Sequence, residues 1–163
     1  MKARNALCAV ALLAACGASS HRVGVQIGDT APQWSEPLST GGTLSFASLK
    51  GKPVYLNFFA TWCPPCNVEP PWIETLQRRY GGRGVHIVGI DMEEGAAAAQ
   101  RFRAKYGLTY PVVVDSGTLQ DLYNINGLPV HIFIKRDGTI AQTVVGEMSN
   151  AEIEAAVRAI LRS

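Results

Sequence analysis

Strong charge bias, internal repeats and long hydrophobic runs are missing from most of this sequence. Its 15 lysines and arginines and 13 acidic residues give a formal charge of +2, and without Lys2 and Arg4 the balance is 13 against 13. That balance argues against nucleic acid as a partner, which clustered cations would bind. Past residue 15 no apolar run is long enough to cross a bilayer. A composition of 47% hydrophobic and 17% charged residues predicts one globular domain.

The first 15 residues have the pattern of a signal peptide. Lys2 and Arg4 precede an apolar stretch, residues 6–15, that is too short to span a bilayer. The stretch ends in Leu-Ala-Ala-Cys at residues 13–16, which resembles the lipobox of bacterial lipoproteins. The resemblance implies that Cys16 is lipidated and becomes the first residue of the mature chain, where acyl chains hold the protein at a membrane. Cleavage nearby, giving a soluble secreted protein, is the alternative.

These signals divide the chain into a signal peptide (residues 1–15), a lipidated tether (16–25) and a domain (26–163). The tether is short and rich in small and polar residues, so it gives the domain little reach. We expect the protein on the extracytoplasmic side of a bacterial envelope. Gly17, in place of an acidic residue after Cys16, favours the outer membrane if the cell has one.

Cysteine is scarce, and its positions restrict the chemistry. The chain has four cysteines. Processing removes Cys8 and uses Cys16 for lipid, so only Cys63 and Cys66 remain as a redox-capable pair. No structural disulfide is then expected, and no second cysteine pair is available to complete a zinc site.

Apolar runs, helical periodicity and turn residues alternate along the domain. A small hairpin is expected around Thr40-Gly41-Gly42, a second hairpin around Asp137-Gly138, and a closing helix from a capping box at Ser149 and Glu152. Between them we expect strands at 54–60, 85–90, 111–114, 131–135 and 139–145, and helices at 64–80, 95–106 and 119–123. The alternation predicts a mixed α/β domain.

The sequence Cys63-Pro64-Pro65-Cys66 follows the buried strand directly and begins the next predicted helix. Cys63 is expected at the N-cap position, where unpaired backbone N–H groups and the helix dipole stabilise a thiolate. Two prolines in the first turn cost few hydrogen bonds and stiffen the loop. The spacing of three brings both sulfurs to one side of the turn.

This placement predicts thiol-disulfide exchange. The Cys63 thiolate attacks a partner disulfide, and Cys66, lying deeper, resolves the mixed disulfide. No cofactor beyond the Cys63-Cys66 disulfide is required. Packing cysteines or half of a metal site are the alternatives, which the position between strand and helix disfavours.

Residues 54–66, together with Glu69 and Pro71, resemble the membrane-tethered TlpA and ResA branch of the thioredoxin superfamily. The likeness extends over about residues 28–160 and includes Asp-Thr-Ala-Pro at 29–32, Leu-Lys-Gly-Lys at 49–52 and Gly-Leu-Pro at 127–129. It implies a thioredoxin-like three-layer fold with a central mixed sheet, an N-terminal β-hairpin and a helix-strand insertion near 95–114. It also implies a thiol:disulfide oxidoreductase.

For the site, the resemblance implies a cis peptide between Leu128 and Pro129, packed against the cysteines. Leu128, Pro129, Trp62, Pro64 and Pro65 are then expected to contact the partner, with the Leu128 backbone adding to an extended segment of it.

Proton handling is the second expectation for the site. Asn57 stands where ordinary thioredoxins carry a buried acid, so Glu69 is the candidate proton carrier, with a solvated helix surface as the alternative. The resemblance also makes Glu94 a candidate for the site, at the end of a strand where open α/β sheets place ligands. A solvated acidic turn is the alternative for Asp91, Glu93 and Glu94. His131 is unusual, although strand packing is its simpler explanation.

Two other functions are alternatives to this one. A thiol peroxidase resembles Pro-x-x-x-Thr-x-x-Cys, whereas Leu56 and Ala60 occupy those two positions here. A copper-binding assembly factor would use Cys63, Cys66 and His131. The family likeness favours a reductant of envelope proteins, with apocytochrome c cysteines among its substrates, that a membrane thiol transporter recharges. Two intervening prolines do not by themselves set the reduction potential.

Overall fold

The computed structural model describes residues 22–92 and 94–163. The signal peptide and the lipidation predicted at Cys16 lie outside the described residues. The strands are β1 (Ser35–Pro37), β2 (Thr43–Ser45), β3 (Val54–Phe59), β4 (His86–Met92), β5 (Val112–Asp115), β6 (Val130–Ile134) and β7 (Ile140–Val145). The α-helices are α1 (Pro70–Tyr80), α2 (Ala96–Tyr106), α3 (Thr118–Leu122) and α4 (Asn150–Leu161). Short 3-10 turns are η1 (Phe46–Leu49), η2 (Pro65–Asn67) and η3 (Gly81–Arg83).

A five-stranded mixed sheet in the order β5-β4-β3-β6-β7 forms the centre of the domain. β3, β4 and β5 run parallel, while β6 pairs antiparallel with both β3 and β7. β1 and β2 form a separate antiparallel hairpin, and α2 with β5 forms the inserted helix-strand unit. The predicted thioredoxin-like fold is confirmed.

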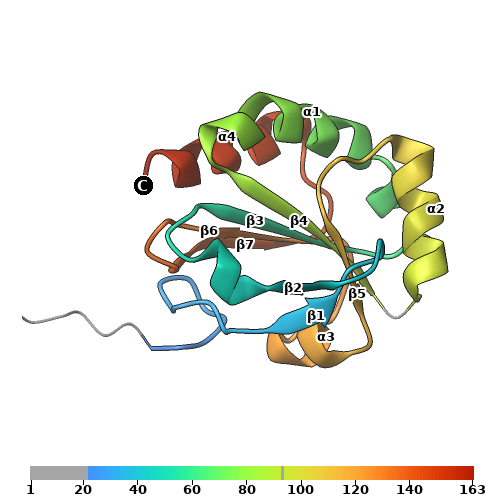
Figure 1. Cartoon of the computed structure of the whole chain (residues 1–163). Helices are drawn as coiled ribbons and strands as arrows, with labels where there is room; N and C mark the ends of the chain where they lie inside the picture. Colours follow the sequence, from blue (N-terminus) through green and yellow to red (C-terminus); the bar gives the residue numbers. More distant parts are fainter. Residues whose placement is uncertain (1–21, 93) are drawn as a thin grey trace, which may run out of the picture.

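The two faces of the sheet are covered by different elements, which gives three layers (Figure 1). One core cluster packs α1, α2 and α4 on one face, and the other packs the N-terminal segment, η1 and α3 on the opposite face. All six residues of β3 are buried. The uninterrupted apolar run that forms β3 is therefore explained by burial on both sides.

Local turn and capping signals form the structures expected of them. The Ser149 side chain accepts a hydrogen bond from the Glu152 N–H, and the Glu152 carboxylate accepts one from the Ser149 N–H, which completes the capping box at the start of α4. In the β6–β7 turn, Gly138 has a φ of +88°, a conformation that favours glycine.

Two local expectations differ from the structure. The helix expected over 64–80 is divided into η2 and α1, because Pro70 and Pro71 lack the N–H groups that would join them. The predicted tether extends to residue 25, yet Arg22 pairs with Asp29 at 3.1 Å and its carbonyl accepts from the Thr30 N–H. The last tether residues are thus bonded to the domain. Within the described ranges, no helix combines the length and apolarity that crossing a membrane requires.

Candidate active site

The reactive loop leaves the sheet at the carboxyl end of β3. The Cys63 N–H donates to the Ala60 carbonyl at 3.1 Å, which turns the chain immediately before the two prolines. Cys63 does not cap a helix as expected: Pro64 holds the N-cap position of η2, and Glu69 holds that of α1. The cysteine lies one residue earlier because Cys63 is still part of the turn that ends β3.

Cys63 and Cys66 form a disulfide with their Cα atoms 5.3 Å apart. Both cysteines are buried in the core cluster beneath α1 and α4, with 4% and 2% of their surface exposed. Trp62, by contrast, is 70% exposed beside them. An oxidised redox pair therefore lies just below the surface, next to a large exposed aromatic ring.

A groove of about 670 Å³ opens over this loop. Cys63 is among its lining residues and Cys66 is not. Its remaining walls come from three places: the reactive loop (Trp62, Pro64, Pro65), Met92, and the segment from Gln120 to Leu128. The peptide between Leu128 and Pro129 is cis, as the family likeness implied. A partner that enters this groove therefore meets Cys63 before Cys66.

Glu69 lies beneath the loop and is only 3% exposed, so the solvated helix surface considered for it is excluded. Its Oε1 accepts a hydrogen bond from the Met148 N–H at 3.0 Å and lies 3.3 Å from His131 Nε2. A buried carboxylate is costly without partners: the Met148 N–H donates a hydrogen bond to Glu69, and His131 Nε2 lies nearby without forming one. Glu69 is three residues past Cys66, within the same short stretch of η2 and α1.

His131 completes a buried polar cluster on the same face of the sheet as the disulfide. The ring is fully buried, its Nδ1 lies 2.8 Å from the Tyr55 hydroxyl, and the Asn57 amide lies 3.4 Å from that nitrogen. Burial raises the pKa of Tyr55 well above its ordinary value, and the charge of Glu69 adds to this effect. This position agrees with the strand packing expected of His131 and adds a hydrogen bond to Tyr55. Side chains alternate between the two faces of a strand, and Val130 and Ile132 of β6 pack in the other core cluster. This alternation is the sequence signal that could have placed His131 on the face of the disulfide.

The acidic turn after β4 is not simply solvated. Asp91 is fully buried, and burial, followed by the neighbouring Glu94, raises its pKa to about 8. The Glu94 carboxylate accepts hydrogen bonds from both the N–H and the hydroxyl of Thr61, two residues before Cys63. Glu94 therefore braces the reactive loop, a contact that no local sequence signal indicated.

Most of the residues singled out from the sequence lie in this one region. The groove brings together Trp62, Cys63, Pro64, Pro65 and Leu128. Cys66 and Glu69 lie beneath it, and Pro129 follows Leu128 directly. Of the described residues, no three histidine, cysteine or acidic side chains gather as a metal ion would require, and this includes the set proposed for copper.

Comparison with known proteins agrees with this geometry. Residues 27–143 match the AhpC/TSA family. Thiol-disulfide oxidoreductase ResA of Bacillus cereus is 35% identical over 80% of this chain and 76% of its own. The chain belongs to the ResA-like branch of the thioredoxin superfamily. As a ResA-like protein it is a thiol:disulfide oxidoreductase.

Solved structures extend the ResA-like assignment to the fold. A secreted disulfide oxidoreductase of Mycobacterium tuberculosis, described as homologous to E. coli DsbE, is 32% identical with a TM-score of 0.73, covering 78% of this chain and 96% of its own. The exposed lipoprotein thioredoxin Etrx1 of Streptococcus pneumoniae is 26% identical with a TM-score of 0.65, covering 78% and 99%. The ResA-like branch thus accounts for the architecture and for the paired cysteines.

Proposed function

We propose that the reduced form of this protein donates electrons to disulfides of exported proteins at the outer face of a bacterial membrane. The observation that carries this proposal is the groove, whose lining includes Cys63 but not Cys66. Thiol-disulfide exchange needs such an asymmetry in either direction, because one sulfur must bond to the partner while the other stays available to release it. The family likeness is what favours the reducing direction.

The reaction transfers one electron pair through two exchanges. The Cys63 thiolate attacks one sulfur of the partner disulfide, the partner's S–S bond breaks, and its second sulfur leaves as a thiolate that takes up a proton. The Cys66 thiolate then attacks Cys63 Sγ, and the first partner sulfur leaves and is protonated in turn. The partner ends as a dithiol, and Cys63-Cys66 ends as a disulfide. No bound cofactor takes part.

Proton transfer in this scheme is assigned to Glu69. Its carboxylate is buried and positioned by the Met148 N–H, and the His131 ring lies 3.3 Å from it. A positioned carboxylate can accept the proton of the Cys66 thiol as that thiol becomes the attacking group.

The groove also suggests how the partner is bound. Trp62, Ile125 and Leu128 give it apolar walls, and an extended peptide can pair with the backbone beside Leu128. Haem-binding cysteine pairs of apocytochromes c are among the substrates that we propose. The disulfide formed in each cycle is reduced again by a membrane thiol-transporting donor.

The placement in the envelope rests on the predicted signal and on relatives. The Mycobacterium tuberculosis structure is described as secreted, and the Streptococcus pneumoniae structure as an exposed lipoprotein. Lipid on Cys16 is the anchor that we propose here, with the outer membrane favoured where the cell has one.

Two cysteine variants test the order of attack. Cys63→Ser is expected to abolish insulin reduction, whereas Cys66→Ser is expected to accumulate mixed disulfides that non-reducing electrophoresis detects. Equal loss in both variants without a trapped species would contradict the assigned roles.

Direction is tested by the reduction potential against glutathione. A reductant should lie near the thioredoxin value of about −270 mV, whereas a value near about −120 mV would assign the protein as an oxidant.

A further inference from the structure

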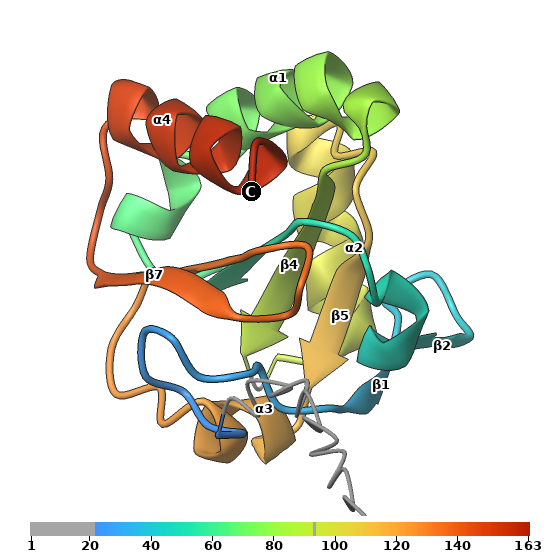
Figure 2. The ribbon, with the colours of Figure 1, turned by 90° about the vertical axis from the view of Figure 1, so that its left-hand side faces the viewer.

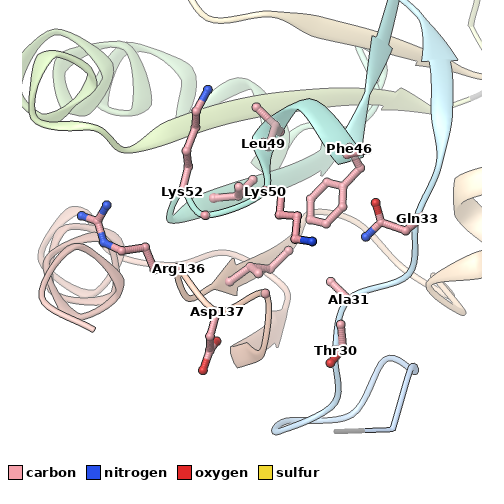
Figure 3. A pocket seen from close by; sticks show the side chains of 14 residues that line it. Thr30, Ala31, Gln33, Phe46, Leu49, Lys50, Lys52, Arg136 and Asp137 are labelled. Atoms are coloured by element: carbon pink, nitrogen blue, oxygen red, sulfur yellow. The ribbon is translucent and has the colours of Figure 1, made fainter. Parts of the chain in front are cut away.

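The end of the sheet opposite the disulfide carries a second cavity, of about 580 Å³ (Figure 3). Its floor includes the apolar side chains of Ala31, Phe46 and Leu49. Lys50, Lys52 and Arg136 extend from the two loops that border it. All three cations are exposed, and the described part of the chain supplies no ion pair to any of them.

More cations lie at this end on other elements. Arg83, in η3, precedes β4, and a smaller hollow brings it together with Arg158 of α4 and with Arg162, which follows α4. His86, at the start of β4, pairs with Val54 at the start of β3, and Val54 lines the larger cavity, so both hollows lie at the same end of the sheet. Figure 2 views the molecule from this end, where the C-terminus also lies. We call these six residues, Lys50, Lys52, Arg83, Arg136, Arg158 and Arg162, the basic end.

Acidic residues lie at both ends of the sheet, and Asp29 on the N-terminal segment is paired with Arg22. Asp91, Glu94 and Asp115 all lie at or just past the carboxyl ends of β4 and β5, which is the end that holds the disulfide. Asp137 is the acidic residue that lines the larger cavity, and its Oδ1 accepts hydrogen bonds from the N–H and hydroxyl of Thr139. The lining of the larger cavity thus carries three cations, Lys50, Lys52 and Arg136, and one carboxylate, Asp137.

The N-terminal segment reaches the domain at the basic end. The Gly28 N–H donates to the Ile140 carbonyl, and the Ala31 N–H donates to the Gly138 carbonyl, so this segment runs beside the β6–β7 turn (Figure 1). Val23 and Ile27, on the same segment, are each 66% exposed. Exposed aliphatic side chains among exposed cations are the composition that membrane interfaces attract.

We propose that the basic end is a contact surface for anionic phospholipid headgroups, which seats the domain with Cys63 facing away from the membrane. Headgroup phosphates lie over the cations, while Val23 and Ile27 enter the interface. The cations are spread over two hollows and several elements, which matches a charged surface better than a single bound anion. This inference rests on the envelope placement in the proposed function and adds the orientation of the domain.

Lysine footprinting of the full chain tests the proposal. The purified protein is mixed with vesicles of phosphatidylcholine, with or without phosphatidylglycerol, and acetylated with acetic anhydride. We expect phosphatidylglycerol to slow acetylation of Lys50 and Lys52 by at least about fivefold, the effect of roughly one cation near an anionic surface. High salt should restore the rate. Lys105, on α2, is the internal control and should be unaffected.

Charge reversal gives the matched comparison. Arg136→Glu should remove most of the protection of Lys50 and Lys52, and Lys52→Glu should do the same for Lys50. Arg101→Glu, the same change on α2, should leave both lysines protected. Unchanged thermal unfolding in each variant confirms that the fold is intact.

Three results would overturn the proposal: equal acetylation in both kinds of vesicle, protection of Lys105 in place of Lys50 and Lys52, or the same protection by inorganic phosphate without vesicles. The last would indicate an isolated anion site. Insulin reduction without vesicles tests the proposed oxidoreductase function separately, so loss of that activity and loss of footprinting protection are distinguishable.

Discussion

The two ends of the central sheet carry polar groups in opposite states. At the disulfide end, Glu69, Asp91 and His131 are buried and surrounded by the core. At the basic end, Lys52 and Arg136 are exposed to solvent. Burial makes the charge of a group depend on its neighbours, which suits proton-coupled chemistry, whereas an exposed cation keeps its charge and acts on other surfaces. One fold thus separates the reaction from the surface that we expect to position it.

Apart from the cysteine variants, Glu69→Gln should have the largest effect at the disulfide end. Loss of the carboxylate is expected to slow exchange by about 100-fold near neutral pH, as removal of a general base does. Loss of the nearby negative charge should also lower the pKa of the active-site thiols, because a like charge no longer opposes the thiolate. The pH profile of iodoacetamide alkylation measures this shift.

Glu74→Gln is the matched control, since Glu74 is a second buried glutamate of α1. Its carboxylate accepts hydrogen bonds from the Thr109 N–H and hydroxyl. This variant should lose stability without moving the alkylation profile. An unchanged profile in Glu69→Gln would leave that residue with a structural role alone.

Asp91→Asn should change how stability depends on pH. Because burial raises the pKa of Asp91 to about 8, the folded protein keeps a proton that the unfolded chain, with a pKa near 4, releases. The stability of the parent should therefore fall as pH rises from about 5 to 8, whereas the variant lacks this slope. At pH 8 we expect the variant to be more stable by about 2 kcal/mol in urea unfolding.

Asp115→Asn provides the contrast. Asp115 is equally buried, but its carboxylate accepts hydrogen bonds from the N–H groups of Leu119 and Gln120 at the start of α3. That variant should be less stable by about 1 kcal/mol. If the stability curves of Asp91→Asn and the parent ran parallel across this pH range, Asp91 would not be the buried acid described here.

His131→Gln should have a smaller effect that depends on Glu69. The ring lies 3.3 Å from the Glu69 carboxylate, so we expect the effects of the two residues on exchange to be coupled. A double-mutant cycle with Glu69→Gln should give a coupling energy of about 0.5–3 kcal/mol from the rates of insulin reduction. Additive effects would show that His131 only fills space in β6.

The smallest effect is expected from the basic end. Lys52→Glu combined with Arg136→Glu should leave insulin reduction in solution within about twofold and stability within about 0.5 kcal/mol, because exposed charges contribute little to folding. A large loss of insulin reduction without membranes would show that the basic end contributes to the reaction itself, which would contradict the separate roles of the two ends.

Much of the fold could be read from neighbouring residues. The apolar run of β3, the capping box at Ser149 and the turn at Asp137-Gly138 are local signals, and each formed the structure expected of it. The break between η2 and α1 was only partly anticipated. Pro70 and Pro71 predicted a bend in this segment. The start of η2 at Pro65, one residue later than expected, depends on how the loop after β3 turns.

The sequence alone was sufficient for the redox chemistry, because two cysteines separated by two prolines after a buried strand can be recognised within a few residues. The charge balance and the order of helices and strands could also be predicted from the sequence alone. Tertiary structure alone decided that Glu69 meets His131, that Asp91 is buried and that the cations gather at one end. Each of these depends on contacts between residues far apart in the chain, and burial is set by such contacts.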